Sequence, residues 1–531
     1  MEDPTDTLEP RDDQPLLLAP DADTWTPPRS FFWIEAAIMA NVFLYGFDTT
    51  ITASTYAVIS SDFDAANMAS WLTTSYLVTS TAFQPLYGRF SDIFGRRICF
   101  FVSTVTFSLG CLGCGAAGNV LLLICMRALS GLGGAGLMTM ATIVNSDMIP
   151  FKNRGIYQAM QNGVMGFGMI CGASFGGSIA DSIGWRWCFL SQVPIAVMGL
   201  VLGVLYVPDP AGGLEHLPST NGSLLSRVDV SGAFLLVIGI SIQLVALSLG
   251  GNELPWSSPW VVGCLFGSTL ILIVFAWVES KVAAIPIIPP RMVAGKFPFL
   301  IQTANNFQGL SAYAYLFMLP LYFQCVLLDS ATTAGTRLII PSLATPLGGL
   351  VAGIVMSRWG KLLSIVQIGL VCMVLGNALV TSFEMEEPVW KYLVYVFPAN
   401  FGQGMVNPGT LFTSPAFFDH SDHAVSASTT YLLRSLGGVW GVAITSAIVQ
   451  NTLNARLTKA FHDLPNKNAL IDEIRHSVDA IRSLPPDIQL AARRAYHQGI
   501  QYSFATSTIF AGVAFILACL AQGRGLRNTH K

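Results

Sequence analysis

Two charged side chains lie inside long apolar runs of this chain. Asp48 stands about midway along the run 33–59, and Arg127 stands in the run 119–145. A charge at the bilayer centre costs about 2.5–3.5 kcal/mol on insertion scales, so it persists mainly where it is paired or lines a wet cavity. Asp48 has no basic residue one helical turn away, and we interpret it as a carboxylate that exchanges protons and attracts a cationic substrate. A structural acid bonded to a neighbouring helix is the alternative.

A short loop between two apolar runs, residues 88–97, concentrates charged residues and glycines. Its glycines permit close approach and turning, its aspartate can cap a helix or accept bonds from an arginine, and its cations indicate the cytoplasmic side. Topology alone requires no fixed Asp or Gly, so the loop must do more than orient the chain. Its distinctive residues are Gly88, Arg89, Asp92, Gly95, Arg96 and Arg97.

The G-x-x-x-D-x-x-G-R-R spacing of this loop resembles the signature loop between the second and third helices of the major facilitator superfamily. In that family the loop latches a gate when the transporter faces outward. The resemblance implies that Asp92 is the latch acid and that the three arginines of the loop are its cations. The stretch 147–158 bridges the fourth and fifth runs, and it places Asp147 and Arg154 where they can pair with the loop.

Two glycine-rich runs carry the resemblance further. The run that follows Arg127 resembles the family's fourth-helix motif, which implies proton coupling for this arginine; a structural partner for a backbone carbonyl or for the first helix is the equal alternative. Residues 168–177 resemble an antiporter motif in which Ala173 replaces a proline. We expect its glycines to pack against the other half of the molecule, although plain helix packing also explains them. They are Gly168, Gly172, Gly176 and Gly177.

The composition places these residues in a membrane protein. Of the 531 residues, 52% are hydrophobic and 11% are charged, and the mean hydropathy is +0.56, which excludes a soluble domain of this size. The net charge of −3 argues against a nucleic-acid partner. The ten cysteines lie mostly in apolar runs without a metal-like cluster. We expect no metal, no cofactor besides a proton gradient, and a transporter, not an enzyme.

Hydropathy predicts fourteen membrane spans, arranged as six plus two plus six. We therefore expect an all-α membrane protein with the major facilitator fold, in which two six-helix bundles flank two additional helices. The Lys and Arg distribution places both termini in the cytosol. The predicted regions are a disordered cytosolic tail (1–32), an N-terminal bundle (33–207), a cytosolic linker (208–228), two inserted helices with a linker (229–296), a C-terminal bundle (297–522) whose luminal loop (450–499) forms short amphipathic helices, and a cytosolic tail (523–531).

Several polar and aromatic residues at membrane depth are candidates for a substrate cavity. Such side chains face either a cavity or another helix. For most of them interhelical hydrogen bonds and aromatic packing are the favoured interpretation. The candidates are Trp71, Tyr76, Gln161, Asn162, Asn305, Asn306, Tyr322 and Gln324.

The resemblance covers about residues 33–522 and narrows to the fourteen-span drug:proton antiporter group, within which the chain is similar to fungal vacuolar basic amino acid transporters. It implies a monomer in the vacuolar membrane that exchanges amino acids, cationic ones included, for protons; a plasma-membrane drug exporter is the alternative. An acidic dileucine pattern in the tail would bind a sorting adaptor, and an accidental match is equally compatible with so short a pattern. Its residues are Asp12, Asp13, Leu16, Leu17 and Leu18.

Overall fold

The computed structural model describes residues 26–63, 69–208, 229–251, 254–283, 285–415, 418, 423–462 and 484–521, together with positions 470–471, 474 and 481–482. The sorting pattern and nearly all of the 208–228 linker lie outside these residues. In the described part the chain is helical, and its β-structure is a bridge between Gly250 and Leu254. The all-α prediction is therefore confirmed.

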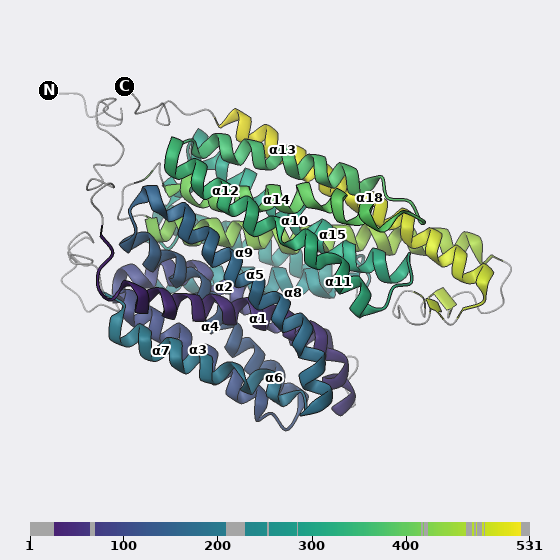
Figure 1. The fold of residues 1–531 in the computed structure, drawn as a ribbon, viewed down its shortest axis with the longest axis horizontal. Coiled ribbons are helices and arrows are strands. Elements are labelled where there is room, and N and C mark those ends of the chain that lie inside the picture. Colours follow the sequence, from purple (N-terminus) through teal and green to yellow (C-terminus); the bar gives the residue numbers. More distant parts are fainter. Residues whose placement is uncertain are drawn as a thin grey trace.

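The helices form two groups, with a pair beside them (Figure 1). The first group, in purple and blue, precedes the pair in the chain, and the second, in green and yellow, follows it. The N-terminal group contains α1 (Phe31–Asp62), α2 (Ala69–Phe94), α3 (Arg96–Gly115), α4 (Val120–Met148), α5 (Phe151–Ser182), α6 (Arg186–Leu190) and α7 (Gln192–Tyr206). The pair is α8 (Val230–Leu249) and α9 (Pro259–Lys281), followed by the 3-10 turn η3 (Pro290–Met292). The C-terminal group contains α10 (Lys296–Cys325), α11 (Ala331–Ser342), α12 (Ala344–Trp359), α13 (Leu362–Thr381), α14 (Val389–Thr413), α15 (His423–Ala460) and α18 (Pro486–Leu520).

Two predicted spans are each divided into two helices. The break between α6 and α7 lies at Ser191, and the break between α11 and α12 lies at Leu343. A proline follows each break by three residues, at Pro194 and Pro346. Proline has no amide hydrogen, and its ring clashes with the carbonyl four residues earlier, which interrupts the helix at that point.

Ten helical segments of the described residues are long and apolar enough to cross a membrane. The other four predicted spans correspond to α2, α5, α10 and α14, which are helical but more polar. Their polar residues lie along the junctions between helices; Gln84 of α2, for example, accepts a hydrogen bond from Ser435 of α15. A membrane protein is thus confirmed, and the count of fourteen spans stays a prediction.

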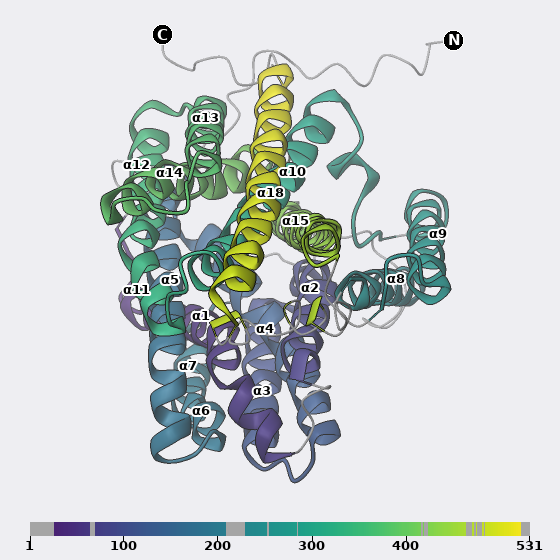
Figure 2. The ribbon, with the colours of Figure 1, turned by 90° about the vertical axis from the view of Figure 1, so that its right-hand side faces the viewer.

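The two groups meet at the end of the molecule where α1 begins and α18 ends (Figure 1). There α2 packs on α15 and α5 packs on α12, and toward the opposite end the groups diverge. Seen from the side, α15 lies between α2 and α18 at the centre of the molecule, and α8 and α9 stand outside, beside α2 (Figure 2). The Lys and Arg distribution predicts that the joined end is cytoplasmic.

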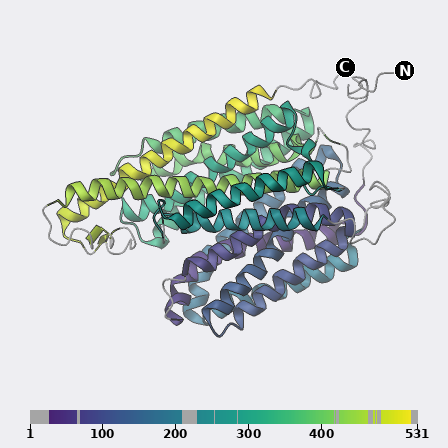
Figure 3. The same ribbon diagram turned by 180° about the vertical axis from the view of Figure 1, so that it is seen from behind.

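The region predicted as a luminal loop, 450–499, is helical at both of its ends. Helix α15 continues to Ala460 and α18 begins at Pro486, so both helices project beyond the others (Figure 3). The predicted spans end before α15 does and begin after α18 does because they follow apolar runs, whereas the projecting turns are held by packing between the two helices. Leu453 and Leu457 of α15 and Tyr496 of α18 are buried in one hydrophobic cluster.

Candidate transport site

The structure brings the two intramembrane charges together. Arg127 Nη1 of α4 donates to both carboxylate oxygens of Asp48 in α1, at 2.8 Å each. The side chains are 1% and 0% exposed. A buried pair of this kind is sensitive to the loss of either partner, because removing one leaves an uncompensated charge at a cost of about 3–5 kcal/mol.

Neutral groups complete the surroundings of this pair. Gln192 Nε2 of α7 donates to Asp48 Oδ1 at 3.3 Å, and Arg127 Nε donates to the carbonyl of Leu72 at 3.1 Å. The Arg127 guanidinium lies 4.5 Å from the centre of the Tyr76 ring, a cation–π distance. Helices α1, α2, α4 and α7 therefore converge on one fully buried ion pair. Tyr76, predicted to line the cavity, lies against this pair instead.

In the signature loop, Arg96 is the central cation. Its Nη1 donates to Asp92 Oδ1 at 2.6 Å and to Ser91 Oγ at 2.7 Å, and its Nε donates to Asp147 Oδ2 at 2.7 Å. Asp92 lies beyond the predicted span 68–88. Burial raises the pKa of its carboxyl group, and the nearby charges of Arg96 and Arg89 oppose this rise. Gly95, with φ of 95°, ends α2 and lets α3 begin at Arg96. The loop thereby ties α2, α3 and α4 together.

The other arginines near this loop have different partners. Arg89 lies 4.0 Å from Asp92, but its Nε donates at 2.8 Å to the carbonyl of Pro286, in the segment that follows α9. Arg97 turns away and donates to the carbonyl of Val207. Arg154 donates to the carbonyl of Ile149 and lies 3.5 Å from His423 Nδ1 of α15. Asp147 therefore pairs with the loop as expected, whereas Arg154 reaches the opposite half.

Glycines allow the two halves to touch at the predicted cytoplasmic end. A Cβ atom on Gly88 would stand 2.1 Å from Ser428 Oγ of α15, and one on Gly155 would stand 2.7 Å from Gly353 Cα of α12. Tyr431 of α15 and Thr142 of α4 share a hydrogen bond of 2.7 Å between their hydroxyls. The structure is thus closed at this end, and the closure needs residues without side chains at both contacts.

The antiporter-like glycines pack within one half, contrary to the expectation that they face the other. A Cβ on Gly168 would stand 2.4 Å from the carbonyl oxygen of Phe43 in α1, and one on Gly172 would stand 2.4 Å from that of Phe47. Gly176 accepts a bond from Cys188 through its carbonyl, and Gly177 has no such neighbour within 4 Å. The face of α5 that meets the other half is an earlier one, from Gly155 to Gly163.

The predicted cavity residues mostly bind other helices. Asn305 and Asn306 of α10 donate to the carbonyls of Thr430 and Leu433 in α15, at 2.8 and 2.7 Å. Gln161 donates to the carbonyl of Ala141, and Asn162 accepts a long bond, 3.4 Å, from Gln158. The bonds of Asn305, Asn306 and Gln161 agree with the favoured interpretation, interhelical hydrogen bonding, whereas the bond of Asn162 lies within α5. Trp71 and Gln324 are partly buried.

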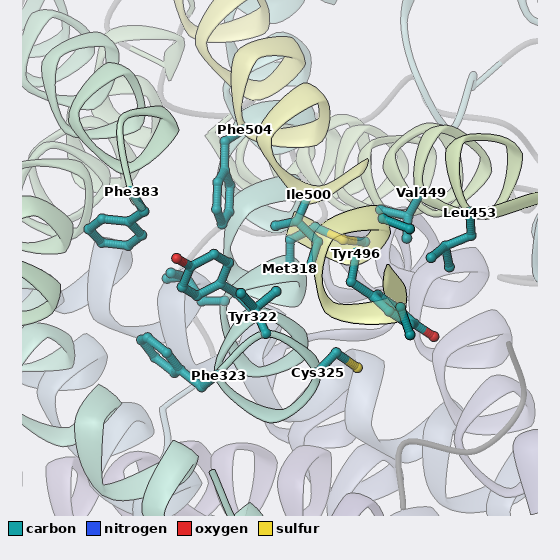
Figure 4. Packing of buried hydrophobic residues seen from close by; sticks show 14 of the residues in the cluster. Met318, Tyr322, Phe323, Cys325, Phe383, Val449, Leu453, Tyr496, Ile500 and Phe504 are labelled. Atoms are coloured by element: carbon teal, nitrogen blue, oxygen red, sulfur yellow. The ribbon is translucent and has the colours of Figure 1, made fainter. Parts of the chain in front are cut away.

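Tyr322 lies away from the junction of the halves, in the largest hydrophobic cluster. It is surrounded by Phe323, Phe383 and Phe504 (Figure 4), and its hydroxyl donates to the carbonyl of Glu384 at 2.6 Å. Its surroundings are those of an aromatic core residue.

Arg434 of α15 is a further charge well inside a predicted span, and it is not among the predicted site residues. Its Nε donates to Asn305 Oδ1 at 3.1 Å, and its Nη2 donates to the carbonyl of Asn407 at 3.1 Å and to Thr410 Oγ1 at 2.9 Å. Arg434 lies within the predicted span 424–449, so the criterion that identified Arg127 also applies to it.

In the part of the chain that the structure describes, no three His, Cys, Asp or Glu side chains are grouped as a metal site. The site therefore consists of arginines, carboxylates and polar neutral groups at helix junctions.

Comparison with known proteins identifies the family. The profile of the Major Facilitator Superfamily matches residues 38–442. The chain is 44% identical to the Vacuolar basic amino acid transporter 2 of Saccharomyces cerevisiae, over 88% of this chain and 100% of that protein. It is 35% identical to the Multidrug resistance protein fnx1 of Schizosaccharomyces pombe, over 91% of each chain.

A solved structure gives the same fold. The human organic anion transporter MFSD10 superposes with a TM-score of 0.58 at 11% identity, covering 93% of this chain and 100% of that one. At that identity the likeness concerns the fold alone. With the family profile spanning most of the helices, this chain belongs to the major facilitator superfamily and is a membrane transporter.

Proposed function

We propose that this chain exchanges protons for amino acids, cationic ones included, and carries the amino acids from the cytosol into the vacuole by alternating access across fourteen spans. The observation that carries the proposal is the fully buried Asp48–Arg127 pair. A carboxylate that is wholly buried against one cation is a two-state element, since protonation removes one of its charges. The similarity to a vacuolar basic amino acid transporter supports the substrate class and the membrane.

Protonation of Asp48 leaves the positive charge of Arg127 unpaired, and this charge couples protons to conformation. When Asp48 takes a proton from the acidic lumen, Arg127 loses its counter-charge in a site that is about 1% exposed. An unpaired buried cation is unfavourable by several kcal/mol, so the helices around it rearrange. Release of the proton toward the cytosol restores the pair. Each cycle thereby moves one proton out of the lumen while the substrate moves in.

The closed end gives this cycle its gate. Gly88, Gly155 and the Thr142–Tyr431 bond join the halves at the predicted cytoplasmic end, which is the arrangement expected of a transporter open toward the lumen. Arg96 holds the ends of α2, α3 and α4 together through Asp92 and Asp147. The N-terminal half therefore moves as one body when the contacts to α12 and α15 separate.

Uptake of labelled lysine, arginine and histidine into vacuolar vesicles that carry the protein tests the proposal. We expect uptake above that of vesicles without it, and loss of this difference on addition of a proton uncoupler. Vesicles with the folded protein but no uncoupler-sensitive uptake of any amino acid would contradict the proposal.

The second candidate is a multidrug:proton exporter in the plasma membrane, and the multidrug resistance relative favours it. Localisation separates the two candidates. Replacing Leu16 and Leu17 by Ala should move the protein away from the vacuolar membrane if the dileucine pattern sorts it there, as fluorescence microscopy of a tagged chain would detect. An unchanged vacuolar location would remove the sorting role, and a plasma-membrane location of the unaltered chain would favour the exporter.

A further inference from the structure

Arg434 is a cation at membrane depth that has no carboxylate partner in the part of the chain that the structure describes. Among the described residues, no Asp or Glu side chain lies within 4.0 Å of it. Its three hydrogen bonds go to neutral oxygens of Asn305, Asn407 and Thr410. A charge in the membrane usually pairs with another charge or with backbone carbonyls, or faces a water-filled cavity. Arg434 has one carbonyl partner and no carboxylate among the described residues, so its charge is a feature to be explained.

One nitrogen of the Arg434 guanidinium makes no hydrogen bond to the described residues. Nε and Nη2 make the three bonds, and Nη1 has no partner in the described part of the chain. The residue is partly exposed, unlike Arg127. The planar guanidinium presents its donors in a fork that matches the two oxygens of a carboxylate. Arg434 thus offers a cation and a free donor in one side chain.

Arg434 lies at the junction of the two halves. The next residue, Ser435, donates to Gln84 of α2 at 3.2 Å, and one turn earlier Tyr431 bonds Thr142 of α4. The Tyr431 ring lies 5.7 Å from the guanidinium carbon. Figure 2 shows α15 at the centre of the molecule, between α2 and α18. A substrate passing between the halves would meet this part of α15.

The purely structural role does not account for the charge. Asn305, Asn407 and Thr410 could be joined by a neutral donor without placing a cation in the membrane. Close by, Gln308 of α10 donates to Asn407 Oδ1, and its own side-chain oxygen is buried without a partner. The same junction therefore offers a cationic donor group and an unused acceptor, which suit the two charged groups of an amino acid.

We propose that Arg434 binds the carboxylate of the transported amino acid. This inference rests on the proposed function and specifies it: the substrate class is compounds with a free carboxylate, and cationic side chains point away from α15 because Arg434 repels them. A cationic drug without an acid group would find no counter-charge here.

Competition with labelled lysine uptake by lysine and by lysinamide tests this assignment, since the amide lacks the anionic carboxylate. For the unaltered protein we expect lysine to compete at least about tenfold better than lysinamide. For Arg434→Gln we expect a weaker apparent affinity for lysine and a ratio between the two competitors that falls to near one. A variant that merely packs poorly would lose uptake without changing this ratio.

Two outcomes would overturn the assignment while leaving the proposed function intact: lysine uptake with no discrimination between the competitors in the unaltered protein, or an unchanged ratio in Arg434→Gln. Absence of any amino acid uptake in the unaltered protein would instead contradict the proposed function. If Arg434→Gln does not fold, Arg434→Lys answers the same question, because it keeps the charge and loses the fork. We expect it to keep a preference for lysine with reduced affinity; equal competition by both compounds in that variant would contradict the assignment.

Discussion

Each half of this transporter has an arginine at membrane depth, and the surroundings of the two arginines differ. Arg127 of the N-terminal half is 1% exposed and paired with Asp48. Arg434 of the C-terminal half is partly exposed and bonded to neutral oxygens. The pair in the first half can respond to a proton, and the cation in the second can respond to an anion. We therefore propose proton coupling for the N-terminal half and substrate recognition for the C-terminal half.

The largest effect is expected when Asp48, the carboxylate that pairs with Arg127, is replaced. Asp48→Asn should abolish uncoupler-sensitive lysine uptake and should destabilise the protein by about 3–5 kcal/mol, because Arg127 stays buried without a counter-charge. Thermal unfolding in detergent measures the stability, and vesicle uptake measures the function.

The double variant Asp48→Asn with Arg127→Gln is the control for this prediction. It should recover much of the lost stability, since no uncompensated charge remains, but it should recover no coupled uptake. Normal gradient-driven uptake by Asp48→Asn would refute the division of roles between the halves.

A side chain at the contact between the halves should have the next largest effect. Gly155→Leu adds atoms where even a Cβ would stand 2.7 Å from Gly353 Cα, so the predicted cytoplasmic end could not close and uptake should fall at least about tenfold. Gly166→Ala is the matched control on the same helix, because no atom lies within 4 Å of its Cβ position. Equal uptake by both variants would show that this contact is not part of the cycle.

Two neighbouring arginines in the signature loop also differ in whether their partners are carboxylates or neutral oxygens. Arg96 binds two carboxylates at 2.6 and 2.7 Å, whereas Arg97 is exposed and donates to a backbone carbonyl. Arg96→Gln should destabilise the protein by about 1.5–3 kcal/mol and slow uptake, and Arg97→Gln should change stability by less than about 1 kcal/mol. Thermal unfolding and uptake of the two variants, compared directly, measure the difference. A larger loss of stability in Arg97→Gln than in Arg96→Gln would mean that Arg97, not Arg96, is the main cation of the latch.

The smallest effect is expected for the hydroxyl bond that joins the halves. Thr142→Val removes the bond to Tyr431, which should weaken the closed state by about 1 kcal/mol and change the KM for lysine by no more than about fivefold. Tyr431→Phe removes the same bond from the other side. The double variant should behave like either single one, and additive changes would show that the two hydroxyls act separately.

The sequence predicted the positions of the helices better than their partners. Asp48 and Arg127 were identifiable because a charge in an apolar run is costly, but their pairing joins residues 79 apart in the sequence and depends on how α1 and α4 pack. The glycines of α5 show the same limit: their spacing predicts close packing, whereas which helix they meet is decided by the whole bundle. Arg434 was identifiable by the same membrane penalty. Its lack of a carboxylate was not, because that depends on residues of α10 and α14.

The proposed cycle exchanges lysine for protons through Asp48. The most direct measurement is the pH inside pre-acidified vacuolar vesicles when lysine is added outside, recorded with an enclosed pH-sensitive dye. We predict a rise in internal pH that requires the protein and is absent in Asp48→Asn. Lysine entry without a change in internal pH, or the same rise in the Asp48→Asn variant, would contradict the claim.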